Sequence, residues 1–394
     1  MMNISAFVIH HSSDFDGYFS GAIAIKFLEK QPEFIQINTI PVNYPYNFHR
    51  IQGGINAARE KNHVIVTFVL DFSFSSSEME WLIENSDIMF FCDHHQGSEY
   101  IYEGIREKYS NNDKVNFNDF AVGGNFTYMH VDNYNILKLA NYLPNDKYER
   151  SIIVNFDASN KFAACKLTYN LLFQSPVTPV VIQHVNDIDL SKVKSEETIN
   201  FKEFLDKISW KNYKLLKNII FNNSITNEAT LMDVIPLQTI YNTFGRLFIE
   251  RRKETINKLL TRFAPFKIPQ CPDLKCGICN NTNGSLTTEL LNHACSSLGF
   301  DVAIAFYDDL VSGVRGFSLR TLREDLDLNE VVEKITGVKG KGHKRSTGFS
   351  LPLEKGVDFV YNNIEKGERS NGSETLIYEF QPLEDDDFGV QGLY

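Results

Sequence analysis

The chain has 394 residues, of which 43% are hydrophobic, and a formal net charge of −11. This length predicts two or three domains with a large apolar core. The acidic balance argues against a protein that coats long nucleic acid, because such binding requires many Lys and Arg contacts to phosphates. Any nucleic-acid ligand should therefore be short, and no long duplex is expected as a partner.

Cellular location can be inferred from the apolar runs and the cysteines. No uncharged apolar run is long enough to cross a membrane, and the N-terminal stretch turns polar and acidic too early for a signal peptide. Cys92, Cys165 and Cys295 lie inside apolar patterns, which is typical of buried thiols in a reducing compartment. We expect a cytoplasmic protein with no membrane partner.

The first third of the chain alternates short apolar runs with helical patterns. This β-α-β-α order predicts an α/β fold with a mostly parallel, open sheet. The predicted elements are a strand at 4–9, a helix at 17–29, a strand at 64–70, a helix at 75–86 and a strand at 87–92.

The rest of the chain predicts further domains. Residues 109–150 are rich in Asn, Asp and Tyr without a sustained period, and we interpret them as a loop-rich insertion or peripheral decoration. Helical patterns resume at 161–173 and 201–260, and a turn-rich boundary, CPDLKCGICNNTNG, precedes a second α/β pattern. We expect a first domain at 1–235, a helical linker at 236–270, and a smaller α/β domain with an acidic tail at 271–394.

Acidic and imidazole side chains follow three of the predicted strands. Because ligands bind outside the carboxyl ends of strands in open α/β sheets, these groups should share one crevice. Clustered bare carboxylates would repel one another, and cations would relieve that repulsion. The groups are His10, His11, Asp14 and Asp16 after the first strand, Asp71 after the second, and Asp93, His94 and His95 after the third.

This donor set predicts two divalent metal ions. Carboxylates mixed with imidazoles suit Mn²⁺, with Mg²⁺, Fe²⁺ or Zn²⁺ as alternatives. A two-metal site of this kind is a common arrangement for hydrolysing phosphate esters, and it requires no serine or cysteine nucleophile.

The second domain carries a basic, glycine-rich stretch, GVKGKGHKRSTG, with GVRGFSLR before it. Arg and Lys bind phosphate, and glycines let backbone N–H groups approach an anion. The stretch is not a P-loop, because His343 occupies the position of the conserved lysine, and a solvated basic loop remains the alternative. The candidate anion-binding residues are Ser318, Arg320, His343, Lys344 and Arg345.

Two shorter motifs have simpler explanations. Asp187 and Asp189 form an Asp-x-Asp that by itself is more often a turn or a helix cap. Cys271, Cys276 and Cys279 form C-x4-C-x2-C, for which reduced thiols in a loop are the better explanation than a zinc site.

Taken in order, these motifs resemble the DHH-DHHA1 phosphoesterase superfamily. The motifs on which the resemblance rests are His-x-x-x-Asp-x-Asp-Gly, an aspartate at the end of a buried strand, Asp-His-His, Asp-x-Asp-Leu, Ser-x-Arg and Gly-x-Gly-His. The resemblance spans nearly the whole chain and is greatest to the oligoribonuclease (nano-RNase) and cyclic-nucleotide phosphodiesterase branch.

The resemblance implies a role for each matched residue. His10, Asp14, Asp16, Asp71, His94 and Asp187 would hold the two metals, although His11 stands beside His10 and only the spacing of four to Asp14 favours His10. Asp93 would orient the first histidine and His95 would contact the scissile phosphate. Ser318, Arg320 and His343 would hold the nucleotide from a second domain that closes over the crevice.

The implied activity is hydrolysis of short oligonucleotides, or of linear or cyclic dinucleotides, to mononucleotides. The final motif departs from the family's usual Gly-Gly-Gly-His by being more basic, which suits a more highly charged substrate. A pyrophosphatase or polyphosphatase and a catalytically retired nucleotide-binding protein are the alternatives, and a homodimer remains open.

Overall fold

A computed structural model describes residues 3–33, 35–121, 126–131, 134–159, 161–175, 177–208, 210–222, 236–281, 284–338, 340 and 342–364. Within these residues the chain forms two compact units that divide between Phe248 and Ile249. Lys339, Lys341 and the acidic tail, which the sequence analysis singled out, lie outside the described residues.

The first unit is built on a six-stranded sheet in the order β2-β1-β3-β4-β8-β5, in which every neighbouring pair is parallel. The predicted parallel α/β architecture is confirmed. Its strands are β1 (Ile4–His11), β2 (Ile35–Val42), β3 (Val64–Leu70), β4 (Ile88–Asp93), β5 (Val115–Asp119) and β8 (Arg150–Phe156), and β6 (Tyr128–Val131) and β7 (Tyr134–Leu137) form a separate hairpin.

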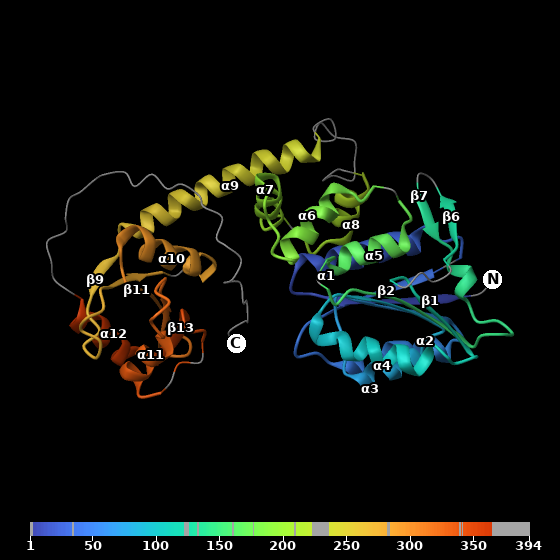
Figure 1. The fold of residues 1–394 in the computed structure, drawn as a ribbon, viewed down its shortest axis with the longest axis horizontal. Coiled ribbons are helices and arrows are strands. Elements are labelled where there is room, and N and C mark those ends of the chain that lie inside the picture. Colours follow the sequence, from blue (N-terminus) through green and yellow to red (C-terminus); the bar gives the residue numbers. More distant parts are fainter. Residues whose placement is uncertain are drawn as a thin grey trace. The chain divides into compact units, whose positions relative to one another are not determined.

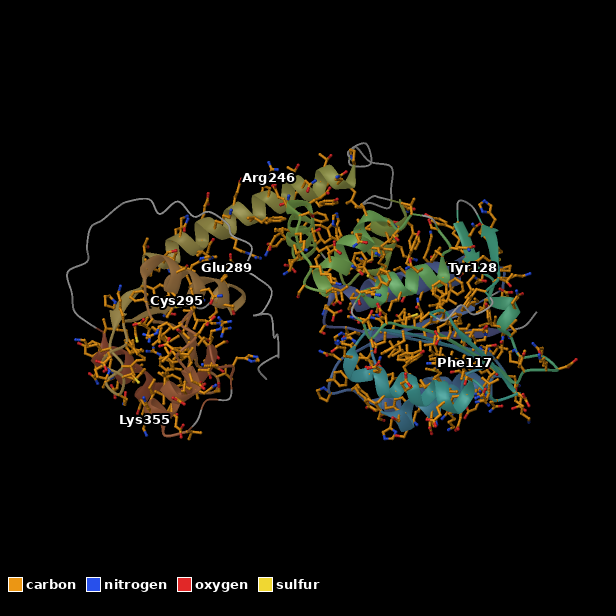
Figure 2. All side chains as sticks on the ribbon, in the orientation of Figure 1. Phe117, Tyr128, Arg246, Glu289, Cys295 and Lys355 are labelled. Carbon is orange, nitrogen blue, oxygen red and sulfur yellow. The ribbon has the colours of Figure 1, made fainter. Side chains whose placement is uncertain are left out.

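Helices cover both faces of this sheet (Figure 1). One face packs against α2 (Phe48–Glu60), α3 (Ser76–Glu84) and α4 (Glu99–Tyr109). The other packs against α1 (Phe15–Glu29), α5 (Ala164–Leu172), α6 (Val180–Asp189), α7 (Glu196–Leu205) and α8 (Tyr213–Lys217). In Figure 2, Phe117 and Tyr128 mark the two sides, each packed against a different core. Strands buried on both faces explain the continuous apolar run of β3.

Two sequence-based assignments require correction. Residues 109–150 are more than a decoration, because β5 joins the sheet beside β8, which itself pairs with β4. The sequence VNFND of β5 has low β propensity, which explains why periodicity missed it. The segment interpreted as a turn-rich boundary contains a strand, β10 (Cys276–Asn280).

The second unit has a mixed five-stranded sheet in the order β13-β12-β11-β10-β9. Only β10 and β11 pair in parallel. Its elements are β9 (Ala264–Phe266), β10, α10 (Thr287–Leu298), β11 (Val302–Asp309), β12 (Val314–Arg320), α11 (Leu328–Thr336), β13 (Ser346–Pro352) and α12 (Leu353–Asn363), preceded by the long helix α9 (Leu237–Leu260). Among the described residues, no helix combines the length and apolarity needed to cross a bilayer.

Candidate metal centre

Seven acidic and imidazole side chains meet at the carboxyl edge of the first sheet. They form three overlapping groups in which the candidate ligand atoms of each group lie within 4.8 Å of one another. We call this set the ligand cluster. Its members are His11, Asp14, Asp16, Asp71, His94, His95 and Asp189.

Asp71 and His94 each belong to two of these groups, and Asp71 lies between His11 and His94. Its Oδ2 is 3.6 Å from His11 Nδ1, and its Oδ1 is 3.5 Å from His94 Nε2. The side chain is 1% exposed, yet neither oxygen has a hydrogen bond of good geometry. Asp71 also has a φ of 54°, a left-handed conformation that is unusual for a residue other than glycine and that occurs often at functional sites.

The end of β1 separates two adjacent histidines. His11 lies in the ligand cluster, with Nδ1 2.6 Å from Asp14 Oδ2. His10 is fully buried outside it: Nδ1 lies 2.6 Å from the His11 carbonyl and Nε2 lies 2.5 Å from Tyr213 Oη. The structure therefore places His11, and not the predicted His10, beside Asp14 and Asp71. Successive side chains of a strand point to opposite sides, so only one of the two can reach the cluster.

Asp14 and Asp16 are positioned by the start of helix α1. Asp14 is the N-cap residue and accepts a hydrogen bond from Gly17 N at 3.0 Å. A side chain at Gly17 would collide with the His11 carbonyl, so glycine allows β1 and α1 to approach closely. Asp16 is buried and accepts backbone hydrogen bonds from Ala164 and Cys165, both at 2.7 Å, at the start of α5.

The Asp-His-His segment follows β4. His94 Nε2 lies 3.7 Å from Asp16 Oδ2 and 3.2 Å from Asp189 Oδ2, and neither of its ring nitrogens has a hydrogen-bond partner. Asp93 accepts a hydrogen bond from His95 Nδ1 at 2.7 Å and another from Ser73 Oγ at 2.7 Å. Asp93 therefore holds the ring of His95, the second histidine of this segment. The resemblance had implied that it would orient the first.

The acidic residue contributed by helix α6 also differs from the prediction. Asp189, at the end of α6, lies in the ligand cluster, whereas the predicted Asp187 does not. Asp187 Oδ1 instead accepts hydrogen bonds from Gln183 Nε2 at 2.6 Å and from Asn186 Nδ2 at 3.1 Å. Residues two apart on a helix point in nearly opposite directions, so only one carboxylate of this Asp-x-Asp can face the cluster.

Burial and mutual charge shape the protonation of the ligand cluster. Burial and the charge of Asp71 raise the pKa of Asp16, and burial and Asp16 raise the pKa of Asp189 to about 7. Burial alone would lower the pKa of His94, but the surrounding carboxylates raise it to about 10. Burial lowers the pKa of His10 to about 4, consistent with its neutral hydrogen bonds outside the cluster.

The unmet hydrogen-bonding capacity of the ligand cluster fits divalent cations. Buried polar atoms in folded proteins are almost always hydrogen-bonded. Here buried carboxylate oxygens and ring nitrogens face one another without hydrogen bonds, as ligand atoms do around an ion. Mixed carboxylate and imidazole ligands suit Mn²⁺ and similar first-row cations. The atoms without a hydrogen bond of good geometry, although several of them lie at ion-pair distance from one another, include His11 Nδ1, both oxygens of Asp71, both ring nitrogens of His94 and Asp189 Oδ2.

In the second unit, the predicted anion-binding residues gather on neighbouring strands. Ser318 of β12 pairs with Gly348 of β13, and Arg320 pairs with Ser346, just after the segment 342–345. Gly342 lies close to the Ser346 carbonyl, where a side chain would not fit, and donates a backbone hydrogen bond to Thr347 Oγ1 at 3.3 Å. Lys344 Nζ donates to the Glu324 carbonyl, and His343 is exposed.

The cysteines of the second unit are divided between two hydrophobic cores. Cys276 and Cys279 pack into different hydrophobic cores, and Cys295 joins the core of Cys279 on helix α10 (Figure 2). Within the described part of the chain, no group of three candidate ligands includes a cysteine. All six cysteines are free thiols, as the composition indicated.

Comparison with known proteins yields similarity to solved structures only. No model of a protein family matches the sequence, and no curated protein matches it. The chain is similar to a pGpG-specific phosphodiesterase from Vibrio cholerae, with 11% identity, a TM-score of 0.34, and 90% of this chain and 95% of that chain covered. It is also similar to CDC45 from Entamoeba histolytica, with 10% identity and a TM-score of 0.31, and the match covers 91% of this chain and 94% of that chain. A third similar structure is a protein assigned as a family II inorganic pyrophosphatase from Methanococcus jannaschii. Its identity is 13% and its TM-score 0.21, and the match covers 88% of this chain and 94% of that chain.

Proposed function

We propose that this protein is a metal-dependent phosphodiesterase that hydrolyses short oligonucleotides, or linear or cyclic dinucleotides, to mononucleotides. The observation that carries the proposal is the placement of Asp71, whose two oxygens face His11 on one side and His94 on the other without a hydrogen bond of good geometry. A carboxylate placed between two sets of ligands suits a hydrolytic site with two closely spaced metals.

The ligand cluster separates naturally into two sets around Asp71. His11 and Asp14 would hold one cation, and Asp16, His94 and Asp189 the other. Divalent cations in such a site lower the pKa of water and neutralise charge on phosphoryl oxygens. The protein's own contribution is to hold the ligands in a fixed arrangement, as Asp16 is held by two backbone N–H groups.

His95 is the group that would act on the substrate directly. It is the most exposed histidine of the ligand cluster, with half of its side chain accessible. The hydrogen bond from its Nδ1 to Asp93 raises its pKa to about 9, so its ring can carry a proton at neutral pH. Such a ring can bind a phosphoryl oxygen or give a proton to the leaving group.

The second unit would supply cationic contacts. Arg320 lies next to the segment that carries His343, Lys344 and Arg345, through the pairing of β12 with β13. Arg and Lys suit the terminal phosphate of a short oligonucleotide. The proposed role of these residues, including Ser318, is to bind the nucleotide that is being cleaved.

Hydrolysis by the chelator-treated chain, with and without added Mn²⁺, tests the proposal. The substrates are pApA, a cyclic dinucleotide, a 5-mer RNA, a 24-mer RNA and pyrophosphate. We expect mononucleotides from the shortest RNAs only when Mn²⁺ is present. Turnover of pyrophosphate alone would transfer the assignment to phosphoanhydride hydrolysis. No turnover of any substrate would favour a catalytically retired nucleotide-binding protein.

A further inference from the structure

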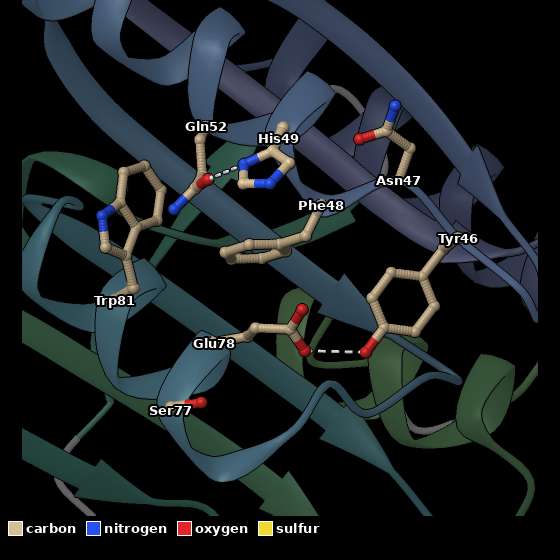
Figure 3. A pocket seen from close by; sticks show the side chains of 8 residues that line it. All are labelled: Tyr46, Asn47, Phe48, His49, Gln52, Ser77, Glu78 and Trp81. Carbon is tan, nitrogen blue, oxygen red and sulfur yellow. Dashed lines mark hydrogen bonds between the residues drawn. The ribbon is translucent and has the colours of Figure 1, made fainter.

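A second candidate site lies in the first unit, between the start of α2 and the start of α3. It is a surface pocket of 530 Å³. Figure 3 shows the rings of Tyr46, Phe48 and Trp81 turned toward one space, with the carboxylate of Glu78 beneath them. Asn47, His49, Gln52 and Ser77 complete the lining.

Glu78 presents one satisfied and one free oxygen to this pocket. Its Oε2 accepts hydrogen bonds from Tyr46 Oη at 2.7 Å and from the backbone N and the Oγ of Ser75 at 3.0 and 2.7 Å. These bonds fix the carboxylate, and although burial opposes it, they lower the pKa of Glu78. No hydrogen bond reaches Oε1 within the described structure, and in Figure 3 this oxygen points toward the space before Phe48 and Tyr46.

The pocket lies at the same edge of the sheet as the ligand cluster, because its residues follow β2 and β3 at their carboxyl ends. Aromatic rings connect the two sites. The ring of Tyr46 lies 5.5 Å from that of Phe72, and Phe72 lies 6.0 Å from the ring of His11. Exposed Tyr44 stacks on Phe72 at 4.7 Å and donates a hydrogen bond to the Ser73 carbonyl. The pocket thus begins two side chains away from the proposed metals.

We infer that this pocket binds a guanine base of the nucleotide substrate, with Trp81 as the stacking surface, Phe48 packed edge to face against that ring, and Glu78 Oε1 as the acceptor for the base edge. Aromatic rings are the usual surfaces on which unpaired bases stack. Guanine carries N–H donors on two adjacent atoms of one edge, which suits an ionised acceptor held in place. The inference rests on the proposed function for the identity of the ligand, and it adds a base preference that a pyrophosphatase would not need.

Binding of guanosine 5′-monophosphate to the full chain in the presence of a chelator tests this inference without any contribution from metals. Calorimetry or ligand-observed NMR gives the Kd for the wild type and for Glu78→Gln and Trp81→Ala. Glutamine retains an oxygen for Ser75 and Tyr46 but places a donor where the base needs an acceptor. Glu84→Gln is the matched control, because Glu84 lies on the same helix, outside the pocket and largely exposed.

We expect Glu78→Gln and Trp81→Ala each to raise the Kd at least about tenfold, since a bond to a charged group and a base stack each contribute on this scale. Glu84→Gln should bind as the wild type does, and AMP, CMP and UMP should bind more weakly. Equal Kd values for the four mononucleotides, an unchanged Kd in Glu78→Gln with a native circular dichroism spectrum, or no saturable binding would overturn the inference. Because no metal or turnover is involved, this result is independent of whether the protein hydrolyses phosphodiesters.

Discussion

Two groups of polar side chains are buried in the first unit, and they use their hydrogen-bonding capacity in opposite ways. We call the first group the His184 network. His184 Nδ1 lies 2.9 Å from Thr198 Oγ1, and His184 Nε2 lies 3.1 Å from Tyr241 Oη. The Tyr241 hydroxyl in turn donates a hydrogen bond to Glu197. In the ligand cluster, both oxygens of Asp71 and both nitrogens of His94 lack hydrogen bonds.

This difference separates a structural role from a binding role. A satisfied polar network can stabilise the fold without any ligand, whereas unsatisfied buried groups cost free energy unless something binds to them. Variants of the ligand cluster should therefore lose activity while the fold persists, and variants of satisfied histidines should lose stability first.

The largest effect is expected for Asp71→Asn. Because Asp71 faces both sets of ligands, removing its charge should lower kcat/KM for a dinucleotide by roughly 10²- to 10³-fold or more. Steady-state kinetics with saturating Mn²⁺ measures the loss, and circular dichroism checks the fold. Near-normal turnover in a folded Asp71→Asn variant would contradict both the two-metal site and the assignment of a binding role to the ligand cluster.

The adjacent histidines of β1 provide the sharpest test of whether unsatisfied side chains serve binding and satisfied ones serve stability. His11→Ala should reduce activity by roughly 10²-fold with a smaller effect on stability, because it removes a proposed ligand. His10→Ala should reduce the free energy of unfolding by about 2 kcal/mol or more, because it leaves a cavity and removes the hydrogen bond to the Tyr213 hydroxyl. Urea unfolding and kinetics on both variants measure the two effects. The reverse pattern would restore His10 as the ligand.

The two aspartates of helix α6 should differ in the same way, on a smaller scale. Asp189→Asn should weaken activation by Mn²⁺ and lower kcat/KM by roughly 10- to 100-fold. Asp187→Asn should leave activity nearly unchanged, since asparagine retains an oxygen for Gln183 and Asn186. Titrating Mn²⁺ into chelator-treated enzyme while following turnover distinguishes the two variants. Equal losses would place both carboxylates at the metal.

The smallest effect concerns pH and the His184 network. Burial lowers the pKa of His184, partly offset by Glu197 and Asp187, so the folded protein holds the neutral ring. The unfolded chain binds a proton near the ordinary histidine pKa of about 6.5, and stability is therefore lost as the pH falls through that value. Between pH 7.5 and 5.5 the wild type should lose more stability than His184→Gln does. Urea unfolding in chelator at both pH values measures this difference, and identical losses would show that His184 is not the group responsible.

The sequence by itself determined the parallel sheet and the convergence of most of the site. Continuous apolar runs define β3 and β4, and the carboxyl ends of parallel strands share one edge, so Asp14, Asp16, Asp71 and His94 could be placed together without coordinates. The weakly patterned strands β5 and β10 could not be predicted, because pairing with neighbours, and not local propensity, makes them strands.

Only the tertiary structure decided which member of each doubled motif faces the site. His10 and His11 carry the same donors, and so do Asp187 and Asp189, and their spacings fit almost equally well. The choice depends on which side of β1 packs against Tyr213 and how α6 is rotated about its axis. Both are properties of packing between segments far apart in the sequence, which local pattern does not encode.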